Sequence, residues 1–100
     1  MVKIVVDERW AESSSTGVED AHQRLLTVGS RMVLIKLTLK TENRYRAKNV
    51  QDPLHYDVRT FSPAKESWSY LLSGARPPAT DHEQLIRELV EIAVRLMDGD

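Results

Sequence analysis

The sequence contains no cysteine, only four glycines and four prolines, and no excess of one charge, since its net charge is -1 at pH 7. The lack of cysteine excludes disulfide bonds, zinc–thiolate sites and thiol catalysis. The few glycines and prolines exclude collagen-like and low-complexity chains. With 100 residues, 41% of them hydrophobic, the chain has the size and composition of a single globular domain over residues 1–100.

Long hydrophobic runs are also lacking. The apolar run near the amino terminus ends at Asp7, and the longest uncharged apolar stretch, residues 32–35, ends at Lys36. A secretory signal needs an apolar run of roughly 7–15 residues, and a membrane helix needs roughly 20. We therefore expect a soluble protein without a membrane partner, with the cytoplasm as its default location.

Alternating apolar and polar residues predict three or four strands. The three clearer segments are residues 2–6, 32–41 and 54–61, and the alternation is strongest in the second. Such alternation is typical of a sheet that is covered on one face and wet on the other. Residues 44–50 are a weaker candidate for a return strand. The polar segment 7–16 is predicted to be an exposed loop.

Apolar residues at spacings of three and four predict three helices. The first spans residues 17–28, between a capping box that begins at Thr16 and a terminating Gly29. The second begins at Pro63, carries Trp68 on its apolar face and ends at Gly74. The third follows a capping box at residues 80–83, has the broadest apolar stripe, and ends at Gly99.

This element order describes a two-layer α+β domain. Strand, helix, strand, weak strand, strand, helix and helix would form a small, mainly antiparallel sheet of three or four strands with helices on one face. The strands at residues 2–6 and 32–41 would pair in parallel through a right-handed crossover. The uncovered face of the sheet is then the surface most open to a partner.

Positive charge is concentrated in residues 31–65, which hold eight basic and three acidic groups, whereas the segments before and after it are net acidic. Cations and an aromatic ring on an exposed sheet face can bind phosphates and stack a base. The candidate residues for that role are Lys36, Lys40, Arg44, Tyr45, Arg46 and Lys48. The competing interpretation is that edge strands carry Lys and Arg to prevent aggregation. Nucleic-acid binding is therefore the alternative hypothesis.

Chemistry-bearing residues give a third hypothesis, a small hydrolase or a metal-dependent enzyme. His55 and Asp57 alternate on one strand face and could form an orienting pair, with Asp52 or His82 completing a metal or acid–base site. The position of His22, at the margin of an apolar face, favours a histidine at the core boundary. The spacing requires none of these meetings, so we assign no catalytic residue, metal ligand or cofactor.

Two features favour binding to protein. Trp10 lies in a polar segment, where a large aromatic side chain either folds back on the domain or anchors a partner. The last helix carries more apolar surface than a small sheet can cover, which favours a two-fold dimer. The main hypothesis is a non-enzymatic interaction or accessory module that forms homodimers or binds a larger protein. Its docking surface would be the uncovered sheet face or the Trp10 segment.

Overall fold

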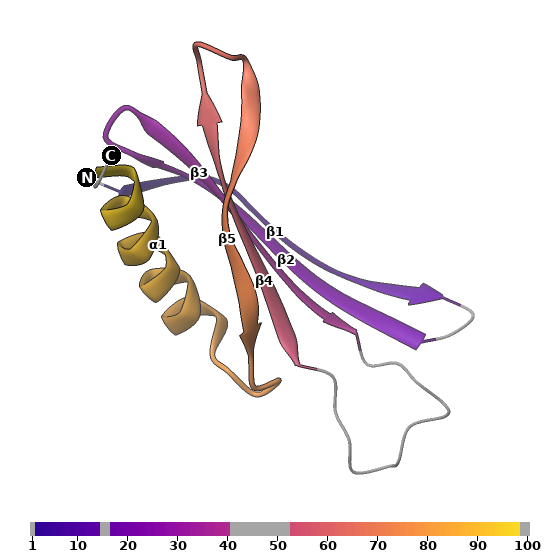
Figure 1. Ribbon diagram of the computed structural model, residues 1–100. Helices are drawn as coiled ribbons and strands as arrows, with labels where there is room; N and C mark the ends of the chain where they lie inside the picture. Colours follow the sequence, from indigo (N-terminus) through magenta and orange to yellow (C-terminus); the bar gives the residue numbers. More distant parts are fainter. Residues whose placement is uncertain (1, 15–16, 41–52, 99–100) are drawn as a thin grey trace.

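The computed structural model describes residues 2–14, 17–40 and 53–98. This part contains five strands and one helix, namely β1 (Val2–Ser14), β2 (Gly17–Val28), β3 (Arg31–Lys40), β4 (Leu54–Ser62), β5 (Ser67–Arg76) and α1 (His82–Asp98). The strands form one sheet in the order of the sequence, and every neighbouring pair is antiparallel. The helix lies against one face of this twisted sheet (Figure 1).

The expected α+β fold with three helices is therefore wrong. Within the described residues the sheet has five strands instead of three or four, and a single helix covers it. The predicted parallel crossover is also wrong, because β1 and β2 form an antiparallel hairpin instead of flanking a helix. In that described part no helix is long and apolar enough to cross a membrane.

The segment 17–28, predicted to be a helix, is β2. A strand with one covered face should alternate apolar and polar residues, but β2 does not. On the side facing α1 it carries His22 and Arg24, which are buried, and on the other side it carries Ala21 and Leu25. Because polar residues lie on the covered side, apolar and polar residues do not alternate along β2. The spacing of its apolar residues therefore resembles that of a helix.

The segment that begins at Pro63, also predicted to be a helix, is a tight turn followed by β5. The amide of Glu66 donates to the carbonyl of Pro63 at 3.3 Å, and Glu66 has a left-handed φ of 51°. Such a turn closes a hairpin between β4 and β5. A β-bulge lies between Val58 and Arg59 in the pairing of the two strands, and it interrupts the alternation along β5.

Strand β1 is longer than predicted, since the expected loop at residues 7–16 is extended as far as Ser14. The charged residues Asp7 and Arg9 favoured a loop in the sequence, but both bind side chains of β2. Asp7 contacts His22 and Arg24, and Arg9 contacts Asp20. The strands expected at residues 32–41 and 54–61 correspond to β3 and β4, and the third predicted helix corresponds to α1. The candidate return strand at residues 44–50 lies outside the described residues.

The core lies between α1 and the central strands. It is built mainly from Val33, Ile35 and Leu37 of β3, Leu54, Tyr56 and Val58 of β4, and Leu85, Ile86, Leu89 and Ala93 of α1. These strand residues alternate, whereas the helix residues follow spacings of one, three and four, so each element presents one apolar face to the other.

The start of α1 differs in detail from the predicted capping box. The amide of Leu85 donates to the carbonyl of Asp81 at 3.0 Å, which makes Asp81 the capping residue. The Thr80 hydroxyl donates instead to the carbonyl of Pro77 at 2.6 Å. The carboxylate of Glu83 binds a side chain of β2, so the helix is fastened to the sheet at its first turn.

Candidate functional site

The register of the strands defines the two faces of the sheet, because directly opposed residues of an antiparallel pair point to the same side. One face carries the core and α1. No described helix or strand packs on the opposite face, which we call the open face (Figure 1). A single layer with one uncovered side is the main feature of this fold that suggests binding.

An apolar band crosses the open face. In register, Val6 opposes Leu25, which opposes Leu34. The row continues through Arg59 to Tyr70. In the neighbouring row the rings of Phe61 and Trp68 lie with their centroids 5.3 Å apart. We call this set the apolar band, and its members are Val6, Leu25, Leu34, Phe61, Trp68 and Tyr70.

Two members of the apolar band are aromatic and well exposed. Tyr70 is 61% exposed and Trp68 is 38% exposed, and both lie in strand β5. The Tyr70 hydroxyl lies 3.2 Å from the Ser73 hydroxyl, which holds the phenol on the open face. Aromatic rings with a polar tip are enriched at protein interfaces. The apolar band therefore has the composition of a docking surface.

The other half of the open face is polar. An open hollow there is lined by side chains of β3, β4 and β5, including Lys36, Thr38, His55, Asp57 and Ser73. The carboxylate of Asp57 accepts a hydrogen bond from Nε of Arg59 at 3.2 Å. Cations and anions thus alternate on this face.

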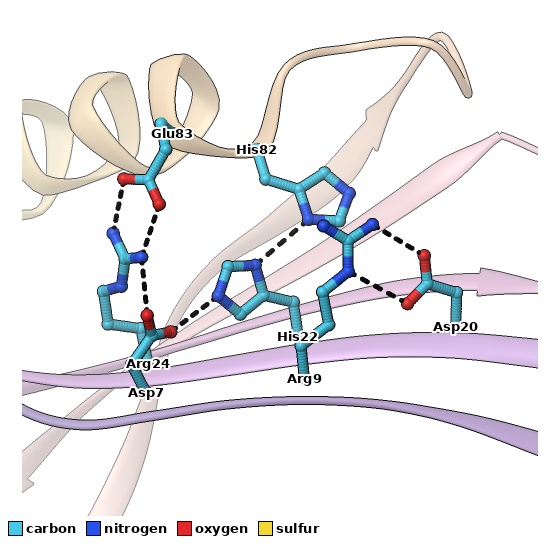
Figure 2. Close-up of polar contacts among 7 residues, drawn as sticks. All are labelled: Asp7, Arg9, Asp20, His22, Arg24, His82 and Glu83. Atoms are coloured by element: carbon cyan, nitrogen blue, oxygen red, sulfur yellow. Dashed lines mark hydrogen bonds and ion pairs between the residues drawn. The ribbon is translucent and has the colours of Figure 1, made fainter.

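A second group of polar residues lies on the covered side, where β1 and β2 meet the first turn of α1. We call it the polar cluster, and Figure 2 shows its seven members, Asp7, Arg9, Asp20, His22, Arg24, His82 and Glu83. They come from three elements, with two from β1, three from β2 and two from α1. The polar cluster therefore joins the edge of the sheet to the helix.

Arg24 is the centre of one half of the polar cluster. Its side chain is buried, and its two terminal nitrogens donate to both carboxylate oxygens of Glu83 at 2.8 and 2.6 Å. One of them also donates to Asp7 at 3.0 Å. These hydrogen bonds lower the pKa of the Glu83 and Asp7 carboxyls below their usual range and raise that of Arg24. Nε of Arg24 is buried and has no partner among the described residues.

Two histidines form the other half. Nε2 of His22 lies 2.6 Å from Oδ1 of Asp7, and its Nδ1 lies 3.1 Å from Nδ1 of His82. The two rings are stacked, with centroids 5.3 Å apart (Figure 2). Alongside them Arg9 forms an ion pair with Asp20 at 2.9 Å.

The hydrogen bonds along this row of one carboxylate and two imidazoles orient the rings, and the imidazoles can take up and release protons. In the described ranges no group of three or more His, Cys, Asp or Glu side chains is arranged to hold a metal ion. The contacts of His22 with His82 and of Arg24 with Glu83 fasten the first turn of α1 to β2.

The residues predicted as sites have different outcomes. Trp10 lies in strand β1 instead of a loop; it is partly exposed on the open face and opposes Ala21. Lys36 is exposed on the same face. The backbone of Lys40 ends β3 opposite Glu19. The remaining predicted nucleic-acid contacts, Arg44, Tyr45, Arg46 and Lys48, lie outside the described residues, as does Asp52.

The suggested pairing of His55 with Asp57 and His82 has a plain geometric outcome. His55 and Asp57 lie on the open face, whereas His82 belongs to the polar cluster on the covered side. The version of the acid–base site that includes His82 is therefore not assembled, and the version that includes Asp52 lies outside the described residues. The polar cluster was missed because its members are far apart in sequence, and the one local signal was the alternation of Asp20, His22 and Arg24.

Comparison of the chain with models of protein families, with curated proteins and with solved structures gave no match.

Proposed function

We propose that the protein is a self-associating interaction module and that two copies dock through their open faces. One observation carries this proposal. The apolar band lies on a sheet face on which no described element packs, and it includes Trp68 and Tyr70, which are well exposed. Apolar patches of this kind on a folded domain mark interaction sites.

The size of the open face agrees with a weak but specific dimer. Five strands spaced about 4.8 Å apart, each with about eight residues rising about 3.3 Å, span roughly 20 Å by 25 Å. Two such faces in contact would bury about 1,000 Å² in total, which is near the lower limit of specific interfaces. We therefore expect association in roughly the micromolar range.

The charges on the open face also favour a second copy as the partner. This face carries the cations Lys3, Lys36 and Arg59 and the anions Glu8 and Asp57, and Lys36 lies directly opposite Asp57 in the register. A face with both signs can match an identical face turned by a two-fold axis, with the cations of one copy opposite the anions of the other. Two sheets packed in this way lie about 10 Å apart, as in a β-sandwich.

Nucleic acid is the alternative partner, and the experiment described below can detect it. On the described open face three cations stand beside two anions, which gives little net attraction for phosphates. The proposal includes the cytoplasmic location expected from the sequence.

Sedimentation equilibrium over a range of protein concentrations tests the proposal. The wild-type protein should shift from the mass of one chain to that of two as the concentration rises. Leu34→Lys places a second cation beside Arg59 in the middle of the apolar band, and its long side chain can still reach water in the monomer. We expect this variant to remain monomeric, with association weakened by at least tenfold, because each dimer would bury two unpaired ammonium groups.

Two matched controls carry the same change elsewhere. Leu96 on α1 is 44% exposed and Ile4 on β1 is 52% exposed, so lysine at either position adds charge outside the open face. Both variants should dimerise like the wild type. Loss of the dimer only in Ile4→Lys would place the interface at the edge of β1. A monomer at all concentrations that gains mass only with added nucleic acid would replace the proposal with the nucleic-acid hypothesis.

A further inference from the structure

The contact between His22 and His82 depends on the number of protons that the two rings hold. Their Nδ1 atoms are 3.1 Å apart, so a hydrogen bond between them needs one nitrogen with a proton and one without. His22 is only 6% exposed, so solvent has little access to this ring. The hydrogen bond between the two rings therefore forms in some protonation states and not in others.

The accepted states follow from the neighbouring atoms. Nε2 of His22 lies 2.6 Å from the Asp7 carboxylate and so carries a proton, which it donates. In the neutral pair Nδ1 of His22 then accepts from Nδ1 of His82. A first added proton can bind Nε2 of His82 and leave this hydrogen bond in place. A second proton must bind Nδ1 of His22, which turns two donors toward each other and puts two positive charges in stacked rings.

The charges around the pair come from all three elements packed against it. They are Asp7 and Arg9 on β1, Asp20 and Arg24 on β2, and Glu83 on α1, with Asp81 just before the helix. The carboxylates favour the first added proton. Arg9, which is close to His82, disfavours positive charge there, and burial acts in the same direction.

We propose that the His22–His82 contact is a pH-sensitive clasp that fastens the first turns of α1 to β2 and opens when both rings are protonated. On opening, the His82 side chain and the first turn of α1 move away from His22. The ion pair of Arg24 with Glu83 keeps its charges at this pH, so opening is partial and reversible. This inference stands on the polar cluster and is independent of association through the open face.

The direction of the pH effect follows from the folded and unfolded states. Burial, then Arg9 and His22, lower the pKa of His82 below its usual 6.5. The unfolded chain therefore binds more protons than the folded chain in this pH range, and stability falls as the pH falls below about 6.5. The carboxyls of Asp7 and Glu83 have lowered pKa values and lose their contribution only below about pH 4.5. The two effects are thus separated along the pH scale.

The test uses the full chain at a concentration where it is monomeric. The three histidines give three resolvable imidazole signals in an NMR titration, and amide hydrogen exchange reports the opening of α1 after correction for intrinsic rates. Between about pH 7.5 and about pH 5 we expect the opening equilibrium of the first turns of α1 to rise on the order of tenfold, which corresponds to one pKa unit of difference. Protection of β3 and β4 should stay constant.

His82→Gln can keep a hydrogen bond to His22 but cannot take up charge, so we expect its α1 protection to be insensitive to pH in this range. His55→Gln is the matched control, because His55 is exposed on the open face, and this variant should respond like the wild type. Equal opening with pH in His82→Gln would overturn the proposal. So would a wild-type titration in which His22 and His82 both become charged while α1 keeps its protection, a measurement that needs no variant.

Discussion

Gly74 gives the most demanding test of the packing on the covered face. It lies opposite Tyr56 in the register of β4 and β5, and a Cβ atom built on it would meet Oη of that tyrosine and, at 2.6 Å, its Cζ. The Tyr56 ring is only 9% exposed and has the guanidinium of Arg76 at 5.2 Å from its centroid. The ring therefore lies over β5 in the space that the missing side chain leaves open.

The substitution Gly74→Ala should force the Tyr56 ring out of this position. Overpacking of a buried site costs typically about 1–3 kcal/mol, and the loss of the Arg76–ring contact adds to it. In a Tyr56→Leu background the shorter side chain does not reach Gly74. The same change should then stabilise the protein by about 0.5–1 kcal/mol, because alanine is less flexible than glycine in a strand.

Urea unfolding of the four proteins in this double-mutant cycle measures both effects. The predicted coupling is about 2–4 kcal/mol, and the effect of Gly74→Ala changes sign between the two backgrounds. An equal loss of stability in both backgrounds would show that the cost arises from the backbone of β5 and not from the Tyr56 ring. A loss below about 0.5 kcal/mol in the wild-type background would show that the ring moves freely.

Four further predictions concern the polar cluster and the core. Glu83→Gln should lower the free energy of unfolding by about 1–2 kcal/mol in urea unfolding; a fully buried pair would lose more, but the Glu83 side chain is 58% exposed. Arg24→Met should be nearly neutral in the same assay, because it removes the buried charge together with its unpaired Nε. As the pH falls below about 4.5 the wild-type urea midpoint should drop, since Arg24 lowers the pKa of Glu83 and Asp7, and this drop should be smaller in Arg24→Met. Leu89→Ala, at a fully buried position of α1, should cost about 2–5 kcal/mol, and a cost under about 1 kcal/mol would contradict the described core.

The sequence predicts the elements whose apolar residues all face one neighbouring layer of the fold. β3 and β4 alternate cleanly because one face packs on α1 and the other meets solvent. The stripe of α1 is equally clear for the same reason. In these elements local pattern and tertiary packing agree, which is why their type and approximate limits can be read from the chain.

β2 and β5 could not be predicted in this way. In β2 the covered face carries His22 and Arg24, whose partners lie on β1 and α1, so the expected alternation is absent. In β5 the bulge makes Leu71 an extra residue, so the consecutive Leu71 and Leu72 both pack against the core, a spacing that also suits a helix. Tertiary contacts and a local irregularity override the pattern in both strands.

The open face and the polar cluster also differ in how far the local sequence predicts them. Exposure of Lys36 on an uncovered face follows from the alternation of β3 alone. The polar cluster depends on residues 59 and 60 positions apart, such as Arg24 with Glu83 and His22 with His82. No local spacing brings such pairs together before the register of the strands and the path of α1 are known.

Intermolecular contacts in solution test the main proposal most directly. In a sample that mixes isotope-labelled and unlabelled chains at a concentration above the dissociation constant, filtered NMR spectra record only contacts between copies. Face-to-face docking predicts signals from the rings of Trp68 and Tyr70 to the methyl groups of Leu25 and Leu34 of the other copy. A dimer whose only intermolecular signals come from residues 2–6, or a mass that never exceeds one chain, would contradict docking through the open face.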